Sequence, residues 1–203
     1  MKLIAPFLGV PSPERRRATK PVRQQAAKLD ESDLLGVCAA CFAQPEREFH
    51  YVAIDILDAR AKKLSEASLP SLRRLAETTS WWDTIDALST VVGAGVAHFA
   101  SWRAEMERWA VDPDFWIRRI AILHQLGRRD ATDVERLFRI ILVNADDREF
   151  FIRKAIGWAL RDLAWTNPAV VKEFVDLHRS SLSPLSVREA MKNIERGKVR
   201  KVG

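Results

Sequence analysis

The sequence has little of what a membrane-spanning or exported protein would need. Its uninterrupted apolar runs fall well short of the roughly 18 residues that cross a bilayer. Its N-terminus lacks the hydrophobic segment and cleavage site of a signal peptide. We therefore expect a cytoplasmic protein.

Cysteine is also scarce: the two present, Cys38 and Cys41, form one CxxC pair without the second pair that would complete a zinc site. We interpret them as small core residues, with a thioredoxin-like redox role or metal ligation as weaker alternatives. The four histidines are His50, His98, His124 and His178, and no two of them are paired at i,i+4 spacing. No metal is therefore expected, and no other cofactor.

Strict alternation of apolar and polar residues, the pattern of a β-strand, is absent as well. Apolar residues instead recur at helical spacing, most clearly at Phe49, Val52, Ala53, Ile56 and Leu57. Turn and capping residues divide the chain into about ten short helices with short connections. The sequence therefore predicts an all-α fold.

What the sequence does contain is a weak internal repeat. Four segments that start with an aromatic ring align with one another, at residues 50–57, 82–88, 116–123 and 151–158. The segments recur at a spacing of 32 to 35 residues. This spacing is typical of HEAT-like helix pairs, which stack into a right-handed α-solenoid with a concave face. An irregular helical bundle is the alternative.

Basic residues outnumber acidic ones, with 33 Lys and Arg against 27 Asp and Glu, which gives a formal charge of +6. This excess favours a polyanionic partner. Cations and indoles alternate along one predicted helix face, at Lys154, Trp158, Arg161 and Trp165. Such a face could bind phosphates and sugars or bases. Taken alone, it is better interpreted as a tryptophan that fills a gap between repeats, with the neighbouring cations reaching to solvent.

Two further places stand out. Arg118 and Arg119 interrupt an otherwise apolar helix, so one of them must lie near buried surface and needs an anion, either a structural partner such as Asp86 or a DNA phosphate. Trp82 and Asp86 lie one turn apart on another helix, for which Ser80 is the expected N-cap. Small residues follow them on the same face, which predicts a shallow cleft with one acid. A salt-bridge role for Asp86 is the alternative, and we interpret the neighbouring Asp83 as a first-turn helix-dipole partner.

With these places identified, the sequence resembles the bacterial AlkD-like DNA alkylation repair enzymes, which are HEAT-like-repeat alkylpurine DNA glycosylases. The resemblance runs over essentially the whole chain, through residues 7–16 (FLGVPSPERR), 80–86 (SWWDTID), 116–119 (WIRR), 149–158 (EFFIRKAIGW) and 186–190 (SVREA).

This resemblance implies a monomer that binds duplex DNA containing alkylated purines on a concave, basic face and hydrolyses their N-glycosidic bonds. It implies Asp86 as the catalytic carboxylate, with Trp82 and Trp158 flanking the sugar. The candidate DNA-binding residues are Arg118, Arg119, Arg153, Lys154 and Arg161. Together these assignments predict a repair enzyme associated with the nucleoid.

The resemblance also implies one domain over residues 1–203, with a basic tail at 196–203. The family's additional N-terminal helical segment, which carries an aromatic residue that helps to cover the lesion, is expected to be missing through truncation or natural shortness. A rival interpretation is a non-catalytic HEAT-like protein that binds duplex or distorted DNA. A protein-binding scaffold fits less well, because it would need apolar anchors in place of Lys154 and Arg161.

Overall fold

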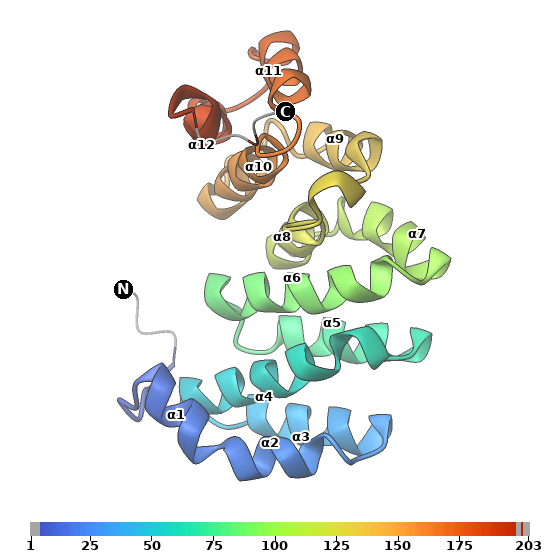
Figure 1. The fold of residues 1–203 in the computed structure, drawn as a ribbon, viewed down its shortest axis with the longest axis vertical. Helices are drawn as coiled ribbons and strands as arrows, with labels where there is room; N and C mark the ends of the chain where they lie inside the picture. The colour runs from blue at the N-terminus through green and yellow to red at the C-terminus, as the bar shows by residue number, and fades with distance from the viewer. Residues whose placement is uncertain (1–4, 198–199, 201–203) are drawn as a thin grey trace. The chain divides into compact units, whose positions relative to one another are not determined.

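The computed structural model describes residues 5–197 and 200 (Figure 1). Within this part the chain is all-helical, with no β-strand, which confirms the predicted fold class. Two compact units divide it, residues 1–103 and 104–203. The right-handed superhelix, the single domain and the concave face stay predictions, and most of the predicted tail at 196–203 lies outside the described residues.

The first unit contains six complete α-helices and the start of a seventh. Their bounds are α1 Ser12–Ala18, α2 Lys20–Ala26, α3 Glu31–Phe42, α4 Arg47–Arg60, α5 Leu69–Glu77, α6 Trp82–Val96 and α7 Ala100–Trp109. Two short 3-10 helices precede α5, at Ala61–Lys63 and Glu66–Ser68. Helix α4 packs between α3 and α6, and α5 packs against α6 (Figure 1).

The helical stripe predicted on α4 is confirmed, because Val52, Ala53, Ile56 and Leu57 are buried; Phe49, at its start, is partly exposed. Cys38 of α3 is fully buried beside this stripe, and its thiol donates weakly to the Ala53 carbonyl oxygen. Burial, and then the neighbouring Cys41, raise the pKa of the Cys38 thiol to about 12. The interpretation of Cys38 as a core residue is therefore confirmed, and Cys41 is half-buried.

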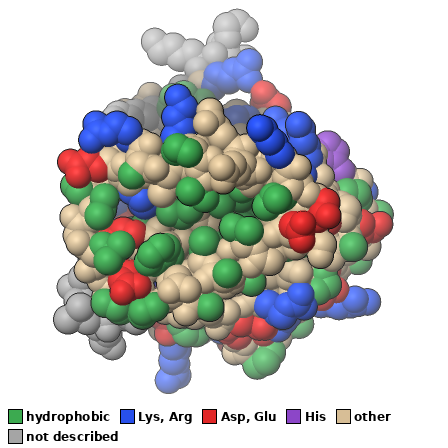
Figure 2. Space-filling view, turned by 90° about the horizontal axis from the view of Figure 1, so that it is seen from below, with side chains coloured by type: hydrophobic (Ala, Val, Ile, Leu, Met, Phe, Trp, Pro, Cys, Tyr) green, Lys and Arg blue, Asp and Glu red, His purple; other side chains and the backbone are tan. Residues whose placement is uncertain are grey.

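Small residues lie on the exposed face of α3. Gly36, Ala39, Ala40 and Ala43 are all exposed there. Seen from below, the molecule shows hydrophobic side chains scattered over this side, with Lys and Arg mostly towards its margin (Figure 2). The exposed surface of the first unit is therefore mixed in character and not uniformly basic.

The second unit is centred on its longest helix, α10. After α7 come α8 Phe115–Leu123, the 3-10 helix Arg129–Ala131, α9 Val134–Leu142, α10 Phe150–Leu163, α11 Pro168–Leu177 and α12 Pro184–Glu195. Helix α10 packs against α8 and, most extensively, against α12 (Figure 1).

Gly157 allows the close approach of α10 and α12. A Cβ atom added at Gly157 would lie 2.5 Å from the Cβ of Glu189 and 2.9 Å from the carbonyl oxygen of Ser186. The Ser186 hydroxyl also donates to the Arg153 carbonyl oxygen across this contact. The small residue in α10 therefore fixes how closely the polar side chains of α12 approach it.

None of the described helices is long and apolar enough to cross a membrane.

Candidate functional site

The N-terminus of α6, which carries two of the candidate site residues, is built differently from the prediction. The helix begins at Trp82, and Ser80 does not cap it. The Ser80 hydroxyl instead donates to the Ala76 carbonyl oxygen at 2.6 Å. Thr79, just before, has a left-handed backbone with φ of 48°. The predicted Ser80 cap is therefore wrong, because the preceding turn points this side chain back towards α5.

Arg47 of α4 holds this turn in place of a cap. Its side chain is buried and forms an ion pair with Asp83. It also donates to the Thr79 carbonyl oxygen at 2.8 Å and to the Thr84 hydroxyl at 2.9 Å. Arg47 Nη1 also lies 3.0 Å from His50 Nδ1, so the guanidinium serves four acceptors, one more than the three N–H donors of an ammonium group.

Asp83 is consequently more than the helix-dipole partner that the sequence suggested. It accepts hydrogen bonds from Arg47, from the Tyr51 hydroxyl at 2.5 Å and from the Thr84 backbone amide at 2.7 Å. Burial disfavours its charged form, but these donors outweigh burial and lower the pKa of Asp83. Burial and the bonded Asp83 raise the pKa of Tyr51 to about 12. This network around Asp83 fixes the first turn of α6.

Trp82 and Asp86 lie one turn apart at the start of α6, as predicted. The Trp82 side chain is 43% exposed and Asp86 is half-buried, whereas Ser89 and Gly93 further along the same face are buried. The Ser89 hydroxyl donates to the backbone carbonyl oxygen of Asp86 at 2.7 Å. The accessible part of this face is therefore its beginning, where an indole and a carboxylate lie together.

In the second unit the two adjacent arginines of α8 have different surroundings. Arg119 is the buried one, with 3% of its surface exposed. It donates to the Phe151 carbonyl oxygen, and its guanidinium lies 5.9 Å from the centre of the Phe151 ring. This confirms that one of the pair lies at buried surface. Arg118 is largely buried too, and it forms an ion pair with Asp147 at 2.7 Å.

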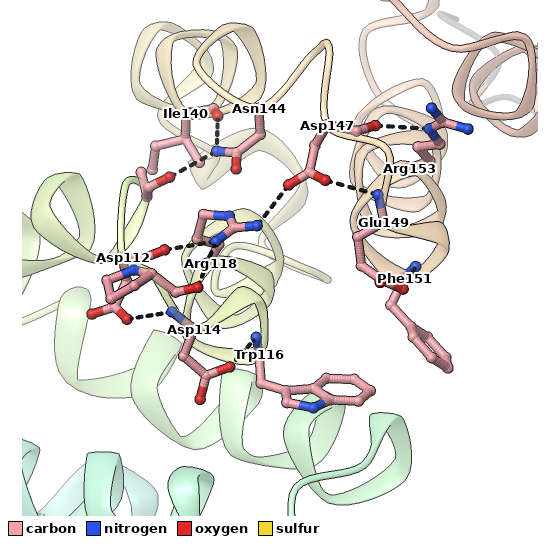
Figure 3. A network of polar contacts seen from close by, with 12 residues as sticks. Asp112, Asp114, Trp116, Arg118, Ile140, Asn144, Asp147, Glu149, Phe151 and Arg153 are labelled. Atoms are coloured by element: carbon pink, nitrogen blue, oxygen red, sulfur yellow. Dashed lines mark hydrogen bonds and ion pairs between the residues drawn. The ribbon is translucent and has the colours of Figure 1, made fainter. Parts of the chain in front are cut away.

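Arg118 belongs to a turn that occurs twice in this unit, at residues 112–118 and 147–153 (Figure 3). In the first copy the Asp112 side chain accepts from the Asp114 amide at 2.9 Å, and Asp114 accepts from the Trp116 amide at 2.8 Å. Arg118 then donates to the Asp112 carbonyl oxygen at 2.7 Å. We call this arrangement the acidic turn; it caps α8.

The second acidic turn repeats these bonds at the start of α10. Asp147 accepts from the Glu149 amide at 2.8 Å, and Glu149 accepts from the Phe151 amide at 3.2 Å. Arg153 closes the turn through its Nε, which donates to the Asp147 carbonyl oxygen at 2.7 Å. Figure 3 shows this bond; unlike Arg118, Arg153 makes no hydrogen bond through Nη1 or Nη2 to the described part of the chain.

Three of the predicted residues share one face of α10: Lys154, Trp158 and Arg161. Trp158 is half-buried, between two cations that both reach Glu189 of α12. Lys154 Nζ lies 2.8 Å from one oxygen of this carboxylate, and Arg161 Nη1 lies 2.8 Å from the other. Trp165, at the end of the predicted stripe, is exposed beside Arg129, whose guanidinium lies 5.4 Å from its ring.

Sequence reasoning missed the residues that position these side chains, Arg47 and Glu189. A basic residue at the start of α4 has no local feature that names its partner in α6. Glu189 lies in a segment noted above only for its resemblance to the family, and its partners Lys154 and Arg161 are about 30 residues away in sequence. No group of three or more acidic, His or Cys side chains suited to a metal occurs among the described residues.

Known proteins similar to this chain agree with the resemblance. No curated protein matches the sequence. A solved structure, a predicted DNA alkylation repair enzyme from Enterococcus faecalis, is 31% identical and has a TM-score of 0.87, covering 94% of this chain and 89% of its own.

Two structures from Streptococcus mutans support the fold. The protein smu.31 of strain UA159 is 15% identical with a TM-score of 0.65, covering 88% of this chain and 94% of its own. AlkD2 is 17% identical with a TM-score of 0.64, covering 85% and 86%. Residues 1–194 match the family described as DNA alkylation repair enzyme, and the chain therefore belongs to this family.

Proposed function

We propose that the protein is a DNA glycosylase that releases positively charged N3- or N7-alkylated purines, such as 3-methyladenine and 7-methylguanine, from duplex DNA. The observation that carries this proposal is the pairing of an exposed indole with a carboxylate at the start of α6, Trp82 and Asp86, in a chain of the DNA alkylation repair enzyme family. It acts as a monomer at the nucleoid and uses no cofactor.

The chemistry asks little of a general acid. Alkylation makes the purine cationic, so the bond from C1′ to the base nitrogen breaks with its electron pair passing to the purine, which leaves neutral. Water then bonds to C1′ and releases one proton. The main barrier is the oxocarbenium-like sugar, which a carboxylate and aromatic faces stabilise more than they stabilise the bound substrate.

The chain's own residues supply these parts in the proposal. Asp86 provides the negative charge opposite the sugar and orients or deprotonates the attacking water. Trp82 and Trp158 offer ring faces to the sugar. Arg119 is predicted to contact a phosphate next to the lesion, although its burial and its hydrogen bond to the Phe151 carbonyl oxygen favour a structural role. Arg153, Lys154 and Arg161 contact the backbone further along. Arg118 is predicted to act with them, although its hydrogen bonds within the second unit favour a structural role.

A non-catalytic protein that binds duplex or distorted DNA is the second candidate, because the cations of α10 would serve it equally. The position of Asp86 argues against it, since a carboxylate beside an exposed indole adds nothing to phosphate binding. Incubation of the protein with duplex DNA that contains 7-methylguanine separates the two. Base release supports the glycosylase, and salt-dependent binding without release supports the alternative.

Asp86→Asn tests the mechanism. The change keeps the shape and removes the charge, so release should fall by two orders of magnitude or more, about 3 kcal/mol in activation free energy. Duplex affinity should stay the same or rise, and folding should survive. Asp58→Asn, on an exposed position of α4, is the charge-matched control and should retain full release. Wild-type release by Asp86→Asn would remove Asp86 from the mechanism.

A further inference from the structure

Glu189 of α12 lies at the centre of a cluster of cations that come from two helices, α10 and α12. The residue is 3% exposed, yet its carboxylate is the shared acceptor for Lys154, Arg161 and Lys192. Lys192 Nζ lies 2.5 Å from the oxygen that Lys154 also contacts. Three cations on one carboxylate leave two positive charges uncompensated in this cluster.

The geometry of the cluster is fixed by backbone packing. Gly157 brings the Cβ of Glu189 against α10, one residue before Trp158 and between the turns that carry Lys154 and Arg161. The carboxylate therefore draws one cation from each side of the helix turn that bears Trp158. All three cations remain partly accessible, with 39%, 28% and 32% of the side chains of Lys154, Arg161 and Lys192 exposed.

A buried carboxylate on a DNA-binding helix should weaken binding if only its charge mattered, because it repels phosphate. Its other effect has the opposite sign. Free lysine and arginine side chains sample many rotamers, and ordering them on a phosphate opposes binding. Glu189 orders these cations before DNA arrives, and the cluster keeps a net positive charge.

Resting on the proposed function, we propose that Glu189 is a positioning residue that holds Lys154, Arg161 and Lys192 as a preorganised site for the phosphodiester backbone of DNA. Lys192 is accordingly a further backbone contact, contributed by α12. Specific engagement of the damaged strand depends on the direction of these cations as well as on their charge.

The decisive comparison is between Glu189→Gln and Asp176→Asn. Asp176 of α11 also receives two cations, from Lys172 at 2.7 Å and Arg179 at 3.9 Å, but it is exposed. Both variants raise the net charge by one. If Glu189 only neutralises its neighbours, Glu189→Gln should bind a 7-methylguanine duplex more tightly than wild type does. Its gain in affinity should then equal or exceed that of Asp176→Asn. If it positions them, Glu189→Gln should bind about tenfold more weakly than Asp176→Asn.

The salt dependence of binding gives a readout that a loss of stability alone would not produce. Log affinity falls with log salt concentration, with a slope of about −0.9 for each phosphate contact. We expect Glu189→Gln to lose about one contact, so that its slope becomes less negative by about 0.9, and Asp176→Asn to keep the wild-type slope. Glu189→Asp, which keeps the charge but withdraws it by one methylene, should lower affinity about threefold. Equal slopes in wild type and Glu189→Gln would overturn the proposal.

A second pair of variants keeps the test valid if Glu189→Gln does not fold. Lys192→Ala and Lys172→Ala each remove one surface lysine from an ion pair with a carboxylate. Only Lys192→Ala should make the salt slope less negative, by about 0.9. Identical slopes for the two variants would refute the site. Wild-type protein that binds no duplex at any salt concentration would instead refute the proposed function, so the two failures are distinguishable.

Discussion

Arg118 of α8 and Asp147 of the following acidic turn form an ion pair, with 2.7 Å between Nη2 and Oδ2. Each partner is largely buried and also serves its own turn: Arg118 donates to the Asp112 carbonyl oxygen, and Asp147 accepts from the Glu149 amide. The pair thus joins the caps of two helices that lie 35 residues apart in sequence.

Replacing Arg118 and Arg153 separately should separate stability from DNA binding. Arg118→Ala removes the ion-pair partner of Asp147, so we expect a loss of about 2–4 kcal/mol in the free energy of unfolding. Arg153→Ala removes one hydrogen bond to a carbonyl, about 1 kcal/mol. It should also weaken duplex binding several-fold, because it removes the Nη atoms that make no hydrogen bond to the described residues. Denaturant unfolding and duplex titration measure the two effects. Normal duplex affinity of Arg153→Ala would contradict the assignment of Arg153 as a DNA contact.

The contact at Gly157 predicts opposite effects for one substitution at two glycines. Gly157→Ala would push α12 away from α10, because its Cβ would meet Glu189 and the Ser186 backbone. We expect a loss of about 2–4 kcal/mol in stability. Gly36→Ala on exposed α3 meets nothing within 4 Å and should stabilise the protein by about 0.5–1 kcal/mol through helix propensity. Thermal unfolding compares them, and a stable Gly157→Ala would contradict the close approach.

His124, at the end of α8, should make folding sensitive to mild acid. Burial, and then the neighbouring Arg136 and Arg128, lower the pKa of His124 to about 4, although its Nδ1 donates to the Ala121 carbonyl oxygen. The unfolded chain binds a proton near pH 6.5, whereas the folded chain does not. Stability from the neutral ring is therefore present above pH 6.5 and is lost as the pH falls towards 4, on the order of 3 kcal/mol.

The comparison of His124→Gln with His98→Gln measures this contribution, since His98 is exposed. Unfolding free energies between pH 7 and 4 should fall less steeply for His124→Gln than for wild type. The His98→Gln curve should run parallel to the wild-type curve. Parallel curves for all three proteins would assign the acid sensitivity to other groups.

Arg47 should set the position of Trp82 without touching DNA. Arg47→Lys keeps the charge, but its three N–H donors cannot serve the four acceptors of Arg47, which are His50, Thr79, Asp83 and Thr84. We therefore expect a loss of about 2–4 kcal/mol in stability and a shifted tryptophan fluorescence. Tyr51→Phe removes one hydrogen bond to Asp83 and should cost about 1–2 kcal/mol. Base release should fall more in Arg47→Lys than in Tyr51→Phe. Unchanged release in a folded Arg47→Lys would separate this network from the site.

The helical fold could be predicted from sequence because apolar spacing is a local property. The stripe on α4 and the nearly complete burial of α8 both follow from it. The start of α6 could not be predicted in the same way. Ser80 has the composition of a cap, but the left-handed Thr79 and the buried Arg47 fix the turn through contacts with residues far away in sequence.

The candidate site divides along the same line. Residue types and helical spacing alone select Trp82, Asp86, Lys154, Trp158 and Arg161. Spacing does not show that Lys154 and Arg161 share one buried carboxylate. The acidic turn leaves a signal in the sequence, because Asp-x-acid-Phe-aromatic-Ile-Arg occurs at both 112–118 and 147–153. Its hydrogen bonds could not be predicted from this motif, because the arginines donate to backbone carbonyl oxygens.

The linked acidic turns have a consequence for how the second unit comes apart. In an array of helix pairs each repeat contacts only its neighbours, and the ends are free to fray one repeat at a time. Here the cap of α10 is completed by an arginine of α8, so opening either turn weakens the other. The helices that carry Arg119 and Arg153 should therefore melt as one cooperative block, with these two cations ordered or lost together.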